Sequence, residues 1–160
     1  MNKILSSKKG EGYIVPCVLI LVIVILFLMI FNYAAAISKV NVIRENTKVV
    51  LDSFVTQNST EIYNSIKQGN DYTEAIDSNE FRTSLMEFCT LEKKSGKLYS
   101  IDGNGKEIYH ISMPTLSFKE SNQLELCVNF TVTVPIRLLN DTTITANIPL
   151  EVTSILTEKF

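Results

Sequence analysis

The chain has 160 residues, with 15 Lys and Arg against 17 Asp and Glu, a formal net charge of −2, and 46% hydrophobic residues. This length is sufficient for one modest domain and an anchor. The part of the chain after residue 36 carries more acidic than basic residues, which argues against a nucleic-acid partner.

An unbroken apolar segment, Tyr13–Ala36, follows the N-terminal tail, and no Asp, Glu, Lys or Arg occurs between Gly12 and Ser38. As a helix, this segment rises about 36 Å, against about 30 Å for the hydrocarbon core of a bilayer. A cleaved secretory signal has a shorter apolar region, of roughly 7–15 residues. Cys17 is not a lipoprotein cysteine, because the apolar stretch follows it. The segment therefore predicts a transmembrane helix.

Lys3, Lys8 and Lys9 crowd the short tail of residues 1–12 before the span. The positive-inside rule favours a cytoplasmic position for this tail. We therefore expect a single-pass protein of the cell membrane, with a transmembrane helix over residues 13–36 and an extracytoplasmic remainder.

A helical pattern continues beyond the span over residues 37–68. No Gly or Pro interrupts the chain from Asn32 to Lys67, and the run 69–71, Gly-Asn-Asp, reads as the stop. Six residues spaced three and four apart form one narrow stripe: Ala36, Val40, Ile43, Thr47, Val50 and Phe54. This stripe packs against the chain's own domain in one interpretation, and forms a seam between subunits in the other.

A second helix is expected to begin near Asp77, because Asp77 and Glu80 have the spacing of a capping box. Three apolar residues that follow share one face: Phe81, Leu85 and Phe88. We expect the run 93–96, Lys-Lys-Ser-Gly, to end this helix.

From Lys97 onward the hydrophobic period changes to two. Residues 97–111 read as a hairpin around a Gly-rich turn, and residues 123–138 and 142–152 read as two further alternating strands. Pro135 and Pro149 fall in these strands and indicate sheet edges or bulges. An antiparallel sheet with one buried face is predicted.

The predicted fold class is α+β. A long N-terminal transmembrane helix continues into a small antiparallel β-sheet domain with one further helix, over residues 69–160, in a pilin-like arrangement. The stripe of the long helix would cover the apolar side of the sheet.

Three cysteines are present: Cys17, Cys89 and Cys127. Cys17 lies in the span. Cys89 and Cys127 lie in the soluble part, where a disulfide between them and two free thiols are both possible. Cys127 points to the outward face of its strand, so a bond to Cys89 requires part of that face to be covered. No second histidine or CxxC accompanies them, so no metal site is predicted.

Catalytic motifs are missing from the sequence. His110 is the only histidine and has no partner motif. Asp102 and Asn104 match the first two ligand positions of a calcium loop, but Lys106 occupies the third, so a plain turn is expected. We expect no enzyme activity, no cofactor and no small-molecule substrate.

Glu11 is the one carboxylate at the edge of the span. It is a surface charge beside Lys8 and Lys9 in one interpretation. In the other, several such helices bundle, and the carboxylate neutralises the amine of a neighbour.

The run 8–14, Lys-Lys-Gly-Glu-Gly-Tyr-Ile, followed by an apolar span, resembles the N-terminus of TadE-like minor pseudopilins of Gram-positive bacteria. These GEGYI-type short membrane proteins are associated with tight-adherence (Flp, type IVc) pilus systems. The resemblance covers about residues 8–36 and implies other pilin or pseudopilin subunits and a pilus platform protein as partners. It also implies processing between Gly10 and Glu11. Pilin-type sequences usually hold their glutamate at the fifth mature position, which here is Val15, so an uncut anchor is the alternative. Pro16 matches the early proline of such spans.

Two functions are therefore considered. The first is a non-enzymatic, pseudopilin-like component of a pilus or secretion apparatus that assembles through its N-terminal helix, with Glu11 as the assembly residue. The second is a stand-alone single-pass membrane protein whose extracytoplasmic domain binds a partner or ligand.

Overall fold

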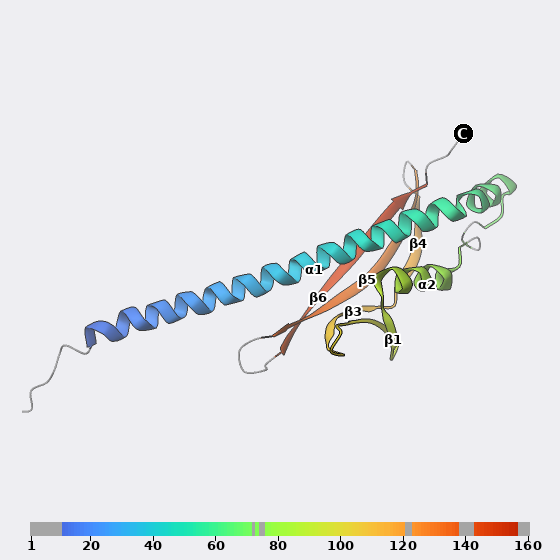
Figure 1. Cartoon of the computed structure of the whole chain (residues 1–160). Helices are drawn as coiled ribbons and strands as arrows, with labels where there is room; N and C mark the ends of the chain where they lie inside the picture. Colours follow the sequence, from blue (N-terminus) through green and yellow to red (C-terminus); the bar gives the residue numbers. More distant parts are fainter. Residues whose placement is uncertain (1–10, 72, 74–75, 121–122, 138–142, 157–160) are drawn as a thin grey trace, which may run out of the picture. The chain divides into compact units, whose positions relative to one another are not determined.

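The computed structural model describes residues 11–71, 73, 76–120, 123–137 and 143–156. The chain separates into two compact units, Met1–Ile37 and Ser38–Phe160. Within the described residues, the elements are a long helix and a short helix, followed by six antiparallel strands (Figure 1). The predicted α+β class is confirmed.

Helix α1 (Glu11–Gln68) is continuous from the first unit into the second. It ends where the sequence predicted. The Gly69 N–H donates to the Ile66 carbonyl and the Asn70 N–H to the Ser65 carbonyl, at 3.1 and 2.9 Å. This pair of bonds is a Schellman cap, and Gly69 supplies the left-handed residue that it needs, with φ of 71°.

Helix α2 (Ser78–Cys89) begins as predicted. The carboxylate of its N-cap, Asp77, accepts from the Asn79 N–H at 2.7 Å. The helix ends earlier than predicted. Thr90 adopts a left-handed conformation with φ of 51°, and its N–H caps the last turn.

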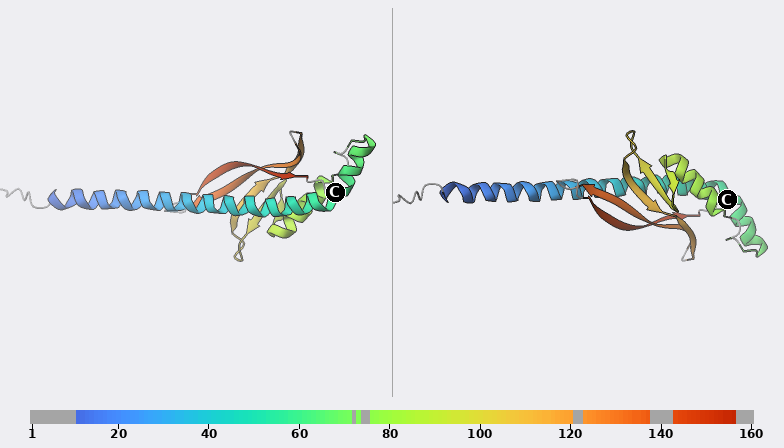
Figure 2. Two further views of the ribbon diagram at one scale, coloured as in Figure 1. Left: turned by 90° about the horizontal axis from the view of Figure 1, so that it is seen from above. Right: turned by 90° about the horizontal axis from the view of Figure 1, so that it is seen from below.

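The six strands are β1 (Glu92–Lys94), β2 (Lys97–Ile101), β3 (Glu107–Ser112), β4 (Thr115–Glu120), β5 (Leu124–Arg137) and β6 (Thr143–Ile155). All pairings are antiparallel, in the order β1-β2-β3-β5-β4, and β6 pairs with the other side of β5. The predicted hairpin and the two predicted long strands are confirmed as β2–β3, β5 and β6. The two long strands are curved (Figure 2).

Strands β1 and β4 were not predicted. The run from Lys93 to Gly96 was expected to end α2, and that expectation is wrong: Lys93 and Lys94 belong to β1. Ser95 and Gly96 both have positive φ and form the two-residue turn to β2. The three residues of β1 are charged and exposed, so no apolar alternation marks them.

The stripe on α1 packs on the chain's own sheet, as the first interpretation held. Within the second unit, five stripe residues are at most 6% exposed: Val40, Ile43, Thr47, Val50 and Phe54. Rings from the two helices meet, because Phe54 lies edge-to-face on Phe81 of α2 with centroids 5.5 Å apart. The alternating face of β5 is buried beneath them, through Leu126, Val128, Phe130, Val132 and Val134.

Both strand prolines lie at unpaired edges. The pairing of β5 with β3 covers Val132 and Thr133 and stops before Pro135. Strand β6, which contains Pro149, pairs with β5 alone among the described strands. Neither missing N–H therefore removes a ladder bond.

Candidate functional site

The apolar N-terminal part of α1 is the first candidate site. Every residue from Tyr13 to Phe31 is exposed, and the most hydrophobic window has a mean hydropathy of 3.5 with none of it buried. An apolar surface on all sides of a helix of this length needs a nonaqueous environment. By its length and composition this helix can cross a membrane, which fits a single-pass membrane-anchored protein.

Polar groups within the apolar segment are placed as a bilayer requires. Tyr13 and Tyr33 lie near its two ends, about 30 Å apart along the helix, which matches the separation of two membrane interfaces. The Asn32 amide donates to the Leu28 carbonyl of its own helix at 2.8 Å. This bond gives the amide a partner without any second chain.

Glu11 is the first residue of α1. Gly10, the other half of the predicted processing site, lies outside the described residues, and so do Lys8 and Lys9. Pro16 lies inside α1, where it has no N–H to donate to the Gly12 carbonyl one turn earlier. Processing after Gly10 and assembly through Glu11 stay predictions.

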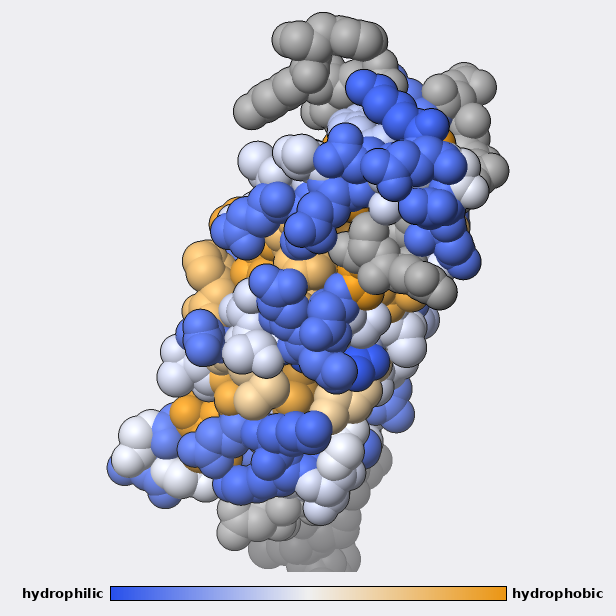
Figure 3. Space-filling view, turned by 90° about the vertical axis from the view of Figure 1, so that its right-hand side faces the viewer, coloured by the Kyte–Doolittle hydropathy of each residue, from blue (hydrophilic) through white to orange (hydrophobic). Residues whose placement is uncertain are grey.

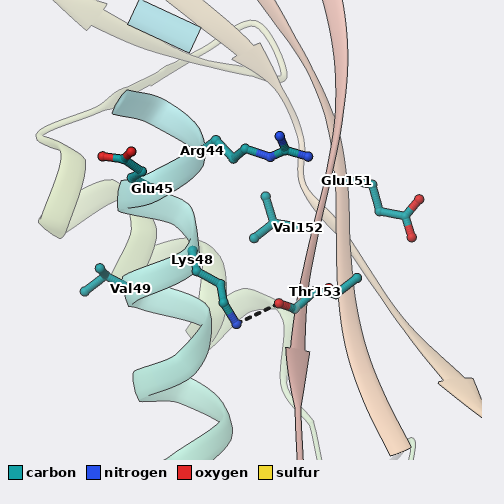
Figure 4. Close-up of a pocket in the computed structure, with 7 residues that line it drawn as sticks. All are labelled: Arg44, Glu45, Lys48, Val49, Glu151, Val152 and Thr153. Atoms are coloured by element: carbon teal, nitrogen blue, oxygen red, sulfur yellow. Dashed lines mark hydrogen bonds between the residues drawn. The ribbon is translucent and has the colours of Figure 1, made fainter. Parts of the chain in front are cut away.

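A polar cluster joins α1 to β6 in the second unit, and Figure 4 shows its bond between Lys48 and Thr153. The Lys48 ammonium donates to the Asp52 carboxylate at 2.6 Å and to the Thr153 carbonyl at 2.8 Å. The Ser154 hydroxyl, which is 3% exposed, donates to the same carboxylate oxygen at 2.5 Å. The cluster fixes the rotation of α1 on the strand, because the donors come from both elements.

An open groove of about 460 Å³ lies beside this cluster, lined by Arg44, Glu45, Lys48, Val49, Glu151, Val152 and Thr153. Arg44 extends from α1 toward β6 in Figure 4. The face drawn in Figure 3 is mostly hydrophilic, with apolar patches between the hydrophilic residues. The groove offers a guanidinium beside a small apolar floor.

The two soluble cysteines are free thiols, as is Cys17. Cys89 lies near Tyr109, and burial raises the pKa of both groups. The register places Tyr109 two residues from buried Ile111, on the helix-covered face of the sheet. Cys127 lies on the opposite face, because it alternates with buried Leu126 and Val128. In the structure Cys89 and Cys127 are thus free thiols on opposite faces of the sheet, which is the second of the two alternatives.

Cys127 is nevertheless fully buried, although its face is the outward one. Lys119 of β4 and Glu151 of β6 form an ion pair across β5 on this face. Burial raises the pKa of the Cys127 thiol. The sequence could not reveal this cover, because it depends on the strand β4 that was missed.

His110 lies on the sheet between charged neighbours. Its Nδ1 lies 2.7 Å from the Glu107 carboxylate and its Nε2 lies 3.3 Å from the Lys97 ammonium. Both are polar contacts of a half-buried strand side chain. In the neighbouring turn, the Asp102 carboxylate accepts the N–H groups of Asn104 and Lys106 at 2.9 and 2.8 Å. Its Oδ1 accepts both bonds and holds the turn together, as expected for a plain turn.

Within the described ranges, no group of three or more His, Cys, Asp and Glu side chains could hold a metal ion. Comparison with known proteins gave no match to a family model, to a curated protein or to a solved structure. Inference about function therefore rests on the chain itself.

Proposed function

We propose that this protein is a non-enzymatic, membrane-anchored, pseudopilin-like component of a pilus or secretion apparatus that assembles through its N-terminal helix. One observation carries the proposal. The same helix exposes an apolar surface in its N-terminal part and packs against the buried face of a small sheet domain in its C-terminal part. A subunit of this kind can pack laterally in the membrane while its domain forms the outer surface.

In this proposal Glu11 directs assembly. A carboxylate in the first turn of α1 is favoured by the helix dipole. In a bundle of spans it is further stabilised by a neighbour's amine, because two unpaired charges in low dielectric cost more. Partners are other pilin or pseudopilin subunits and a platform protein in the same membrane.

The test compares Glu11→Gln with Glu45→Gln, a matched loss of one exposed carboxylate from the same helix. Full-length variants are expressed in the native host and purified by affinity. Glu11→Gln should abolish co-purification with platform and pilin proteins while leaving membrane insertion intact. Glu45→Gln should retain it. Unchanged association of the Glu11 variant would refute the assembly role.

Processing is tested separately, by mass spectrometry of the mature N-terminus. A chain that begins at Glu11 has been cut after Gly10. A chain that retains Lys8 and Lys9 is an uncut anchor, which leaves lateral assembly through the helix possible.

The second candidate function is a stand-alone single-pass protein whose outer domain binds a partner or ligand. The open groove beside Arg44 favours it. Under this alternative Arg44→Gln reduces partner capture by the full-length protein, and Glu11→Gln does not. The two variants therefore separate the two functions.

A further inference from the structure

Strand β6 has an open edge over residues 143–149. It pairs only with β5 among the described strands, and Thr143, Thr145, Asn147 and Pro149 are all exposed. We propose that this edge pairs with the same edge of a second copy of the chain, in an antiparallel two-fold arrangement.

Three contacts show which backbone groups of β6 point outward. The backbone N–H of Thr131 points away from β6 and donates to the Ser112 hydroxyl. Thr131 is paired with Pro149, so the backbone nitrogen of Pro149 faces away from β5, where the ladder needs no N–H. The Thr153 carbonyl accepts from Lys48, outside the sheet. The N–H of Leu156, which is an even-numbered residue, donates inward to the Leu124 carbonyl of β5. The odd-numbered residues therefore present free N–H and C=O groups at the edge.

The other edges carry charged protection, whereas this edge has only Pro149, at its far end. Strand β1 is three charged residues long, and β4 carries Lys119, which is paired with Glu151. The outer edge at Thr153 is occupied by Lys48. In contrast, residues 143–150 contain no charged side chain and form an unbroken register with β5. A long, regular, uncharged edge is the kind that pairs with another strand.

The edge is complementary to itself. With Thr145 opposite Thr145 of the second copy, Thr143 lies opposite Asn147, so the exposed face carries matched hydrogen-bonding side chains. On the other face, Ile144, which is 52% exposed, lies opposite Ala146, a large residue against a small one. The outward groups at these odd positions then make about six N–H···O bonds. Pro149 has no N–H, so pairing ends there.

The occupant is a second copy because a neutral edge does not repel itself, and because a common membrane concentrates identical chains. This contact lies in the second unit and does not involve Glu11. Its success or failure is therefore separable from that of the proposed assembly through the span.

Cysteine cross-linking tests the register in full-length protein in its membrane. The background is Cys17→Ala, which removes the exposed native thiol. Thr145→Cys should form a disulfide-linked dimer on mild oxidation, because hydrogen-bonded partners lie about 5.5 Å apart at Cα, within disulfide range. Thr143→Cys alone should not, but mixed with Asn147→Cys chains it should. Thr153→Cys, on the same edge but beside Lys48, should remain monomeric.

The proposal is overturned if Thr145→Cys remains monomeric, or if it cross-links mainly to a different protein. Equal cross-linking of Thr143→Cys, Thr145→Cys and Thr153→Cys would also overturn it, since that pattern reports random collision.

A second pair of variants needs no thiol. Asn147→Pro removes an outward N–H that the fold does not use, and Asn147→Ala removes the side chain but retains that N–H. In detergent, the proline variant should dimerise about tenfold more weakly than the alanine variant, because each dimer loses two donors. Thermal midpoints measured alongside show whether both variants are folded. Equal dimer affinity of two folded variants would contradict the proposal.

Discussion

Lys119 and Glu151 form an ion pair across the central strand β5. Lys119 lies opposite Glu125 and Glu151 lies opposite Asn129, so the pair crosses the sheet diagonally with Cys127 between its members. The side chains of the pair are 53% and 44% exposed, while Cys127 beneath them is fully buried. The pair therefore shields a thiol more than it stabilises the fold.

Removal of this cover should expose Cys127. In Glu151→Ala, we expect severalfold faster alkylation of Cys127 in the folded protein, with the free energy of unfolding changed by less than about 1 kcal/mol, as for other exposed ion pairs. Peptide mass spectrometry measures the labelling at each cysteine. Cys89, on the other face, is the internal control. An unchanged Cys127 rate would show that the backbone alone buries the thiol.

Stability should fall at alkaline pH. Burial raises the pKa of Cys89 and of Cys127 above the ordinary value of 9.0, so the folded state holds their protons more tightly than the unfolded chain. The stabilisation is fully present below the ordinary pKa and is lost as pH rises through the folded one. Denaturant unfolding in detergent should therefore show a loss of stability that begins near the ordinary pKa of 9.0, with a smaller slope in Cys127→Ala. Equal slopes in the wild-type protein and in Cys127→Ala would count against a contribution from the buried Cys127 thiol.

Asp52 should be important for stability although it is exposed. Its carboxylate accepts from Lys48 and from the buried Ser154 hydroxyl. Asp52→Ala leaves that hydroxyl without its partner and should lower the free energy of unfolding by about 1–3 kcal/mol. Glu45→Ala, which removes an exposed carboxylate from the same helix, should cost less than about 0.5 kcal/mol. Similar losses of unfolding free energy in the two variants would show that the polar cluster does not stabilise the fold.

Two phenylalanines on α2 should contribute very differently to the free energy of unfolding. Phe81 is fully buried and contacts the ring of Phe54, whereas Phe88 is 54% exposed. Phe81→Ala should destabilise the domain by about 3–5 kcal/mol. Phe88→Ala, the control on the same helix, should cost about 1 kcal/mol or less. Comparable losses would mean that α2 does not pack through the face described.

The elements with regular periods could be predicted from the sequence. The stripe from Val40 to Phe54, the cap at Asp77 and the alternation of β5 depend on local spacing and were confirmed, as was that of β6 from Ala146 onward, although Ile144 is 52% exposed. Strand β1 could not be predicted, because its three residues are charged and exposed.

The contacts of the candidate sites were less predictable. Lys48 and Asp52 have the spacing of a helix ion pair, but their bonds to Thr153 and Ser154 depend on where α1 lies on the sheet. The cover over Cys127 depends on the register of three strands. Such long-range relationships have no local signal in the sequence.

The central claim is that the apolar part of α1 crosses the membrane once and leaves the sheet domain outside the cell. Thiol accessibility in intact cells tests it most directly, with Asn104→Cys at the exposed β2–β3 turn and Ser7→Cys in the tail. We expect a membrane-impermeant maleimide to label Asn104→Cys in intact cells, and Ser7→Cys only after permeabilisation. Labelling of Ser7→Cys but not Asn104→Cys in intact cells, or recovery of the full-length protein in the soluble fraction, would contradict the claim.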